Sequence, residues 1–302
     1  MPNETAASRP QSKSLAYIGL GIGILSLGMS AIFVRWADAP GPVTGFYRMF
    51  ISTVILTPFF AKRNRKGSAL TTRTILYPAL GGIFLALDLA LWNTSVFYTS
   101  ASNATLLSNT APLWVALGAW LIFQENLYRN FWIGLSFALA GAVLIVGTDF
   151  FISPRFGVGD LMAAAAGIFY AGYYLSTQRG REYFDPISYI WLMGIFSSIT
   201  LALVNFIMGY TLLGYSRETW IVFFVIAVIL QLIGYIAISY AMGHLPASVV
   251  APTMIGQPIM TTILAIPLLG EIPLPIQLLG GVIALTGIYL VNRAYHQKTR
   301  QP

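Results

Sequence analysis

The sequence lacks cysteine altogether and holds only two histidines, His244 and His296. Without thiols the chain forms no disulfide, no thiolate metal site and no cysteine nucleophile, and two distant histidines do not make a metal cluster. The sequence also has no Walker motif, which excludes ATP hydrolysis of the P-loop type. We therefore expect neither a metal nor a cofactor.

Charged residues are scarce as well, at 9% of the 302 residues, while 57% are apolar. This composition is typical of a chain that lies in a lipid bilayer. The net charge of +7 does not indicate a nucleic-acid partner, because the basic residues stand in short loops between apolar runs. The first apolar run is long and followed by many others, so it predicts a permanent span rather than a cleaved signal peptide.

Ten apolar runs approach the roughly 20 residues that a membrane-spanning helix needs. The sequence therefore predicts an all-α integral membrane protein with ten transmembrane helices. The predicted spans are residues 15–34, 43–60, 74–97, 102–123, 131–147, 161–177, 187–213, 220–242, 247–269 and 276–291.

Lysine and arginine are distributed unevenly between the two sets of loops. Thirteen stand on the side that bears the termini, and three stand on the opposite side: Arg35, Arg155 and Arg217. Since positively charged loops stay in the cytoplasm, both termini are predicted to be cytoplasmic. An even number of spans agrees with termini on one side.

The stretch 101–147 recurs 146 residues later without a gap, in the pairs Ala101–Ala247, Ser102–Ser248, Pro112–Pro258, Glu125–Glu271, Gly134–Gly280, Ala138–Ala284 and Gly141–Gly287. The constant spacing predicts two repeats of five spans each, over residues 15–147 and 159–292. Because five is odd, the second copy enters the membrane from the other side. Such inverted repeats are typical of secondary transporters that work by alternating access.

The pattern Tyr98-Thr-Ser-Ala-Ser-Asn-Ala-Thr-Leu-Leu, followed by Pro112-Leu-Trp, Glu125 and a glycine-rich span, resembles the EamA repeat of the drug/metabolite transporter superfamily. Arg48 also matches an arginine that this family often places in the second span. The second copy departs from the pattern with His244-Leu-Pro. Within the superfamily the chain is most similar to YddG-type exporters of aromatic amino acids, which implies export across a bacterial inner membrane.

Proline interrupts the fourth and ninth spans at equivalent places, Pro112 and Pro258. Each removes a backbone N–H and frees a carbonyl four residues earlier, a defect that needs compensation in a bilayer. We expect the two breaks, with the neighbouring Asn109 and Gln257, to line a central cavity. The alternative is that these prolines are merely tolerated and the amides satisfy the backbone. Pro252 adds a second break to the ninth span, which predicts unequal gating motions.

Arg48 and Asp88 are the only charged residues well inside the predicted spans. Intramembrane charges are costly and usually face a bundle interior or a cavity. We expect Arg48 to receive a substrate carboxylate or to pair with Asp88, which could titrate. The alternatives are that Arg48 extends to the interface and that Asp88 caps polar neighbours.

Polar and aromatic residues four apart share a helix face on three spans. Rings with a few polar atoms suit an amphipathic ligand, although interface belts and plain helix packing use the same residues. The candidate substrate contacts are Asp88 and Trp92, Tyr170 and Tyr174, and Gln231 and Tyr235.

Small residues recur on the fifth and tenth spans, at Gly134, Ala138 and Gly141 and again at Gly280, Ala284 and Gly287. Such stripes let helices approach closely, so we expect helix packing, with a dimer contact as the alternative. Monomer and homodimer both stay open. Glu125 and Glu271 are expected at the two interfaces, where they would fix turns rather than carry protons.

The leading hypothesis is a secondary transporter and not an enzyme, because no nucleophile, base and metal ligands converge within the spans. A simple pore does not explain the inversion. Phosphorylated solutes would call for several buried cations, and only Arg48 is available. We expect export of small zwitterionic solutes, aromatic or other large amino acids, with other metabolites or lipophilic drugs as the alternative. The expected partners are the solute and the lipid bilayer.

Overall fold

The computed structural model describes residues 10–64, 70–95, 97–99, 101–146, 157–269 and 273–298. All regular secondary structure in these ranges is helical. Nine helical stretches within them are long and apolar enough to cross a membrane. The prediction of an all-α membrane protein is therefore confirmed.

The first five predicted spans correspond to seven helices. The third, at Thr72–Ser95, is unbroken, whereas the fourth is divided at the predicted proline break. The helices are α1 (Pro10–Gly28), α2 (Ser30–Trp36), α3 (Gly41–Asn64), α4 (Thr72–Ser95), α5 (Ala101–Ser108), α6 (Ala111–Ile122) and α7 (Arg129–Val146).

The second five spans are built from eight helices. The eighth span contains a π-helix, labelled η1, and the ninth is divided like the fourth. The helices are α9 (Val158–Gly180), α10 (Pro186–Ile207), α11 (Arg217–Ile226), η1 (Ala227–Tyr235), α12 (Ile236–Met242), α13 (Ala247–Thr253), α14 (Gly256–Leu269) and α15 (Pro275–Lys298).

Several span boundaries differ from the sequence prediction, three of them for reasons that the structure shows. The seventh span ends at Ile207 instead of residue 213, since Gly209 takes a positive φ of 71° just beyond it. The sixth and tenth spans are longer than predicted, because their polar ends continue as helix at Val158–Gly180 and Pro275–Lys298. α9 is not among the nine apolar stretches, because it carries buried polar residues such as Asp160, Ser176 and Thr177.

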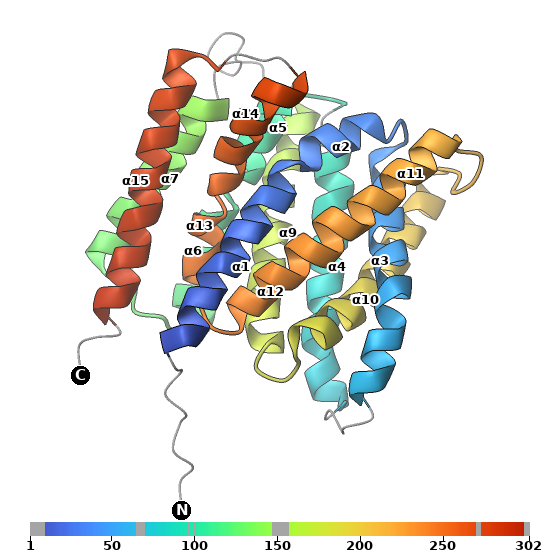
Figure 1. Cartoon of the computed structure of the whole chain (residues 1–302), viewed down its shortest axis with the longest axis horizontal. Helices are drawn as coiled ribbons and strands as arrows, with labels where there is room; N and C mark the ends of the chain where they lie inside the picture. Colours follow the sequence, from blue (N-terminus) through green and yellow to red (C-terminus); the bar gives the residue numbers. More distant parts are fainter. Residues whose placement is uncertain are drawn as a thin grey trace, which may run out of the picture.

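The helix pairs follow the repeat: replacing each helix by its counterpart in the other repeat gives an equivalent set of pairs. α1 packs on η1 and α12, just as α9 packs on α4. α7 pairs with α15 at one edge of the bundle and α3 with α10 towards the other, each helix with its own repeat counterpart (Figure 1). α1 begins and α15 ends at the same end of the bundle, which we call the terminal side; the opposite end is the far side.

The glycine stripes of α7 and α15 lie against each other. A Cβ atom added to Gly141 would lie 2.3 Å from the backbone nitrogen of Ala284, and one added to Gly287 would lie 2.2 Å from that of Ala138. The two backbones are therefore in direct contact, as small-residue stripes allow. The stripes are occupied within the chain, which leaves them unavailable for the alternative of a dimer contact.

The first span is interrupted at Met29, a break that the sequence did not predict. The hydroxyl of Thr261 on α14 donates to the carbonyl oxygen of Gly28 at 2.7 Å. Because this carbonyl accepts a hydrogen bond from a neighbouring helix, it does not need a donor in its own helix. The helical hydrogen bonding can therefore be interrupted here, where α1 ends and α2 begins.

Substitution of Gly287 by alanine should separate α7 from α15, because overpacking of this kind costs about 1–3 kcal/mol. We expect a melting temperature several degrees below that of the parent, measured in detergent by intrinsic tryptophan fluorescence. Gly281→Ala on the same helix is the control, since a Cβ atom there meets nothing within 4 Å. Equal melting temperatures for the two variants would contradict the packing.

Candidate functional site

A cavity of about 350 Å³ lies between the two halves of the bundle. Its wall holds eight of the nine predicted substrate contacts and two of the three predicted helix breaks. These residues are Arg48, Asp88, Trp92, Asn109, Tyr170, Tyr174, Tyr235, Gln257, Pro112 and Pro258. Gln231 and Pro252 do not belong to the wall.

Both proline breaks are present at the wall. Two residues separate the end of α5 at Ser108 from the start of α6 at Ala111, and two separate the end of α13 at Thr253 from the start of α14 at Gly256. The side-chain amide of Asn109 donates to the carbonyl of Thr105 at 2.8 Å. The backbone N–H of Gln257 donates to the carbonyl of Met254 at 2.9 Å. Asn109 therefore both lines the cavity and gives a hydrogen bond to a backbone carbonyl. The two roles that the sequence left as alternatives, cavity lining and backbone hydrogen bonding, are compatible.

Pro252 lies inside α13, one turn before the break, and is buried away from the cavity wall. It therefore bends or weakens the ninth span without contacting the central space.

Arg48 on α3 is buried, with 4% of its surface exposed, and does not extend to an interface. Its Nε donates to Oε1 of Gln231 at 3.2 Å, and its guanidinium carbon lies 5.0 Å from the ring centroid of Tyr235. The buried Nη2 atom has no hydrogen-bond partner. One donor of a cavity-wall arginine thus lacks an acceptor among the described residues, which costs free energy.

Asp88 on α4 is also buried at the cavity wall. No described residue forms a hydrogen bond with its carboxylate, and it is not ion-paired with Arg48 within 4.0 Å. The predicted Arg48–Asp88 pair is therefore absent from the described part of the chain. The cavity wall therefore holds a cationic and an anionic side chain that do not form an ion pair with each other.

Aromatic rings form one wall of the cavity. Tyr170 and Tyr174 on α9 lie 4.8 Å apart between ring centroids, with a hydrogen bond of 3.2 Å between their hydroxyls. Tyr173, which was not predicted, packs 5.5 Å from Tyr235 and supports the ring beneath Arg48. Trp92 contributes from α4. The rings make an apolar surface with polar edges.

The cavity reaches from the middle of the bundle to the far side. Its wall includes Trp36 at the end of α2, Asn93 in the last turn of α4, Val146 at the end of α7 and Gln277 at the start of α15. All four helix ends lie on the far side. The structure is therefore open towards the side opposite the termini.

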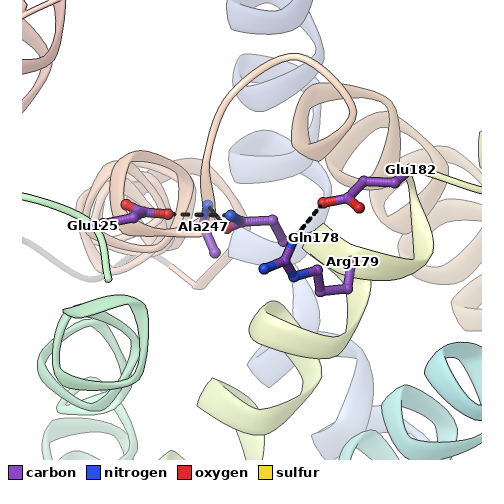
Figure 2. A network of polar contacts seen from close by, with 5 residues as sticks. All are labelled: Glu125, Gln178, Arg179, Glu182 and Ala247. Carbon is purple, nitrogen blue, oxygen red and sulfur yellow. Dashed lines mark hydrogen bonds and ion pairs between the residues drawn. The ribbon is translucent and has the colours of Figure 1, made fainter. Parts of the chain in front are cut away.

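The terminal side is closed by a polar network that includes Glu125, three residues beyond α6. Its carboxylate accepts hydrogen bonds from Nε2 of Gln178 at 3.1 Å and from the hydroxyl of Ser248 at 2.6 Å. Oε1 of Gln178 in turn accepts the backbone N–H of Ala247 at 2.6 Å (Figure 2). We call these four residues the Glu125 network; it ties the end of α6 to the end of α9 and the start of α13.

The Glu125 network gives that glutamate a larger role than the fixed turn that was predicted. Neither Gln178 nor Ser248 was singled out as its partner, because nothing in the local sequence shows that the ends of α9 and α13 meet. Its repeat counterpart, Glu271, lies outside the described residues.

Arg181 forms a second tie on the terminal side, just after α9. Its Nε donates to the carbonyl of Ser239 on α12 at 2.7 Å, and its Nη1 donates to the carbonyl of Phe184. Burial lowers the pKa of Arg181 to about 10, so the group stays charged at neutral pH.

Several polar residues of the cavity wall were not predicted from the sequence, among them Asn93, Thr105 and Thr261. A signal existed for two of them, since Thr105 precedes Asn109 by four residues and Thr261 follows Gln257 by four. That spacing places each pair on one helix face. No group of three metal-ligating side chains occurs among the described residues.

Two segments of the chain, residues 14–147 and 157–293, each match the EamA-like transporter family. An uncharacterized transporter of Archaeoglobus fulgidus is 28% identical over 262 residues, covering 83% of this chain and 88% of its own. YdfC, an uncharacterized transporter of Bacillus subtilis, is 24% identical over 217 residues, covering 69% and 68%. An uncharacterized transporter of Helicobacter pylori is 27% identical over 242 residues, covering 76% and 78%.

A solved crystal structure has the same fold, with a TM-score of 0.78 over 97% of this chain and 100% of that chain, at 15% identity. The named relatives are transporters without an assigned substrate, so the similarity to YddG-type exporters stays a prediction. With two matching repeats that cover nearly its whole length, the chain belongs to the EamA-like transporter family and is a multi-pass membrane transporter.

Proposed function

We propose that this transporter exports small zwitterionic solutes, aromatic or other large amino acids, from the cytoplasm across a bacterial inner membrane by alternating access. The observation that carries the proposal is the buried, unpartnered Nη2 of Arg48 at the wall of the cavity. A substrate carboxylate is the acceptor that this donor lacks.

The charges of the cavity favour a zwitterion over an anion. A charge-assisted bond to Arg48 would stabilise a carboxylate and offset the cost of its desolvation. The unpaired carboxylate of Asp88 supplies an acceptor for an ammonium group. Among the described residues, Arg48 is the only lysine or arginine of the cavity wall, which is too little positive charge for a phosphorylated or nucleotide-linked solute.

The aromatic wall favours an apolar or aromatic side chain on that zwitterion. Trp92, Tyr170, Tyr174 and Tyr235 face the same cavity as the two charges. Sites of this kind enclose roughly 300–1,000 Å³ and combine apolar rings with a few polar groups. A volume of about 350 Å³ lies at the small end of that range, which suits an amino acid.

The open far side and the closed terminal side support alternating access. In an inverted pair of repeats, residues 15–147 and 159–292, exchange of the two conformations would close the far side and open the terminal side. The Glu125 network would have to separate in that exchange, because it joins helices of both repeats. Under the proposed topology, with both termini in the cytoplasm, the present structure would correspond to an outward-open state.

A second candidate is the export of lipophilic drugs or other metabolites. The apolar part of the wall favours it, through Leu27, Ile32, Met254 and Ile255. Such solutes would not need Arg48. A counterflow panel in proteoliposomes distinguishes the two, and failure of every amino acid to compete with labelled phenylalanine would contradict the leading proposal.

Arg48→Ala should reduce phenylalanine counterflow at least about tenfold while the amount of folded protein stays within about twofold, since a charge-assisted bond is worth roughly 1.5–3 kcal/mol. Arg217→Ala is the control, because Arg217 is an exposed arginine at the start of α11. Equal loss of transport and of folded protein in Arg48→Ala would leave this arginine only a structural role.

Asp88→Asn should abolish the response of transport to an imposed proton gradient, while exchange of labelled phenylalanine continues with weaker binding because the amide oxygen remains an acceptor for the ammonium group. The reason is that Asp88 is the single carboxyl group among the wall residues that the structure describes. Uptake into proteoliposomes at matched and unmatched pH measures both quantities. A variant whose response to the gradient equals that of the parent would remove Asp88 from coupling.

The absence of cysteine allows a direct test of the Glu125 network, since one introduced thiol is the only target for a maleimide. Ser108→Cys places that thiol at the cavity wall. Adding Glu125→Ala should raise labelling from the terminal side several-fold, because the closed ends of α9 and α13 lose their common acceptor.

Glu182→Ala is the matched control for that experiment. Glu182 lies on the same side, after α9, where it forms an exposed ion pair of 2.9 Å with Arg179 (Figure 2). Exposed pairs contribute little, so this variant should label like the parent. Similar labelling of the Glu125 and Glu182 variants would mean that the Glu125 network does not close the terminal side.

A further inference from the structure

Gln231 is a fully buried polar side chain, with 0% of its surface exposed, that does not belong to the cavity wall. Its Oε1 accepts a hydrogen bond from Nε of Arg48 at 3.2 Å, and its Nε2 has no partner. The bond to Arg48 is therefore the only one that this side chain makes among the described residues. A buried amide with one unsatisfied group destabilises the fold, so its presence needs a compensating role.

The backbone around Gln231 is specialised. Residues Ala227–Tyr235 form a π-helix between the α-helices α11 and α12. π-helical turns are rare and occur frequently at functional sites. The same segment also supplies Tyr235, whose ring centroid lies 5.0 Å from the guanidinium carbon of Arg48. Both observed contacts to Arg48, the one buried cation that the described residues contribute to the cavity wall, thus come from this π-helical segment.

The two contacts act on different parts of the guanidinium. Gln231 occupies the Nε edge, whereas the Tyr235 ring lies against the guanidinium by a cation–π contact. The Nη2 end stays without a partner. An arginine held in this way loses less conformational freedom when it binds a carboxylate, because its planar fork is already oriented.

We infer that Gln231 is a positioning residue for carboxylate recognition: it holds the Arg48 guanidinium towards the cavity and never contacts the solute. The inference rests on the proposed function and deepens it. It differs from the sequence prediction, which placed Gln231 among the substrate contacts. Selectivity for a carboxylate then depends on a residue behind the cavity wall.

A double-mutant cycle with Gln231→Leu and Arg48→Ala tests this role by phenylalanine counterflow. We expect Gln231→Leu to raise KM about tenfold with Vmax within about twofold, the pattern of lost solute binding. In the Arg48→Ala background the same change should have no further effect, since the two residues act as one unit. Independent, multiplicative effects would overturn the inference.

Ser239→Ala is the matched control on the same span. Ser239 is also fully buried, and its hydroxyl also lacks a partner, but it makes no contact with Arg48. We expect its KM to equal that of the parent. A KM raised equally by Ser239→Ala and Gln231→Leu would show a general packing effect and contradict the positioning role. Gln231→Met, a second variant of similar length, covers the case in which Gln231→Leu fails to fold.

A chemical readout separates failure of this inference from failure of the proposed function. Phenylglyoxal modifies accessible arginine, and peptide mass spectrometry measures the modified fraction at Arg48. Release of the guanidinium in Gln231→Leu should accelerate that modification several-fold, whatever solute is transported. An unchanged rate would refute positioning by Gln231, whereas absence of amino-acid counterflow in the parent would refute only the substrate.

Discussion

A guanidinium buried within an apolar helical bundle is the constraint on which the rest of the site depends. Burial of a charge in a bilayer is costly unless it is solvated by the protein or by a ligand. Here Gln231 and Tyr235 contact one part of the Arg48 guanidinium, and the buried Nη2 atom is left without a hydrogen-bond partner. Asp88 stays separate from it, so the site presents two opposite charges instead of neutralising them internally. The proposed zwitterionic solute would complement both charges.

The near-symmetry of the two halves and their differences have distinct consequences. The pairings of α1 with η1 and of α9 with α4 are related by exchange of the two halves, and so are the breaks before α6 and α14. In the proposed mechanism this relation supplies the two arrangements between which the transporter alternates. The chemistry lies in the differences. Arg48 and Asp88 belong to the first repeat, while the tyrosine wall and the π-helix belong to the second. The cavity is therefore complete only where the halves meet.

Features with local causes could be predicted from the sequence, and features with tertiary causes could not. The breaks at Pro112 and Pro258 follow from a missing N–H, and the stripe of Gly141 and Ala138 follows from its spacing. The break at Met29 depends on a hydroxyl of α14, and the Glu125 network depends on the meeting of three helix ends. Gln231 and Tyr235 share a face, yet only Tyr235 reaches the cavity, a difference of depth that periodicity does not show.

Equilibrium binding of phenylalanine and of its methyl ester to the purified protein tests the central claim, carboxylate recognition by Arg48, most directly. The ester keeps the ring and the ammonium group but removes the negative charge. We expect the ester to bind at least about tenfold more weakly, because it loses a charge-assisted hydrogen bond. Equal affinity of the two compounds would contradict it.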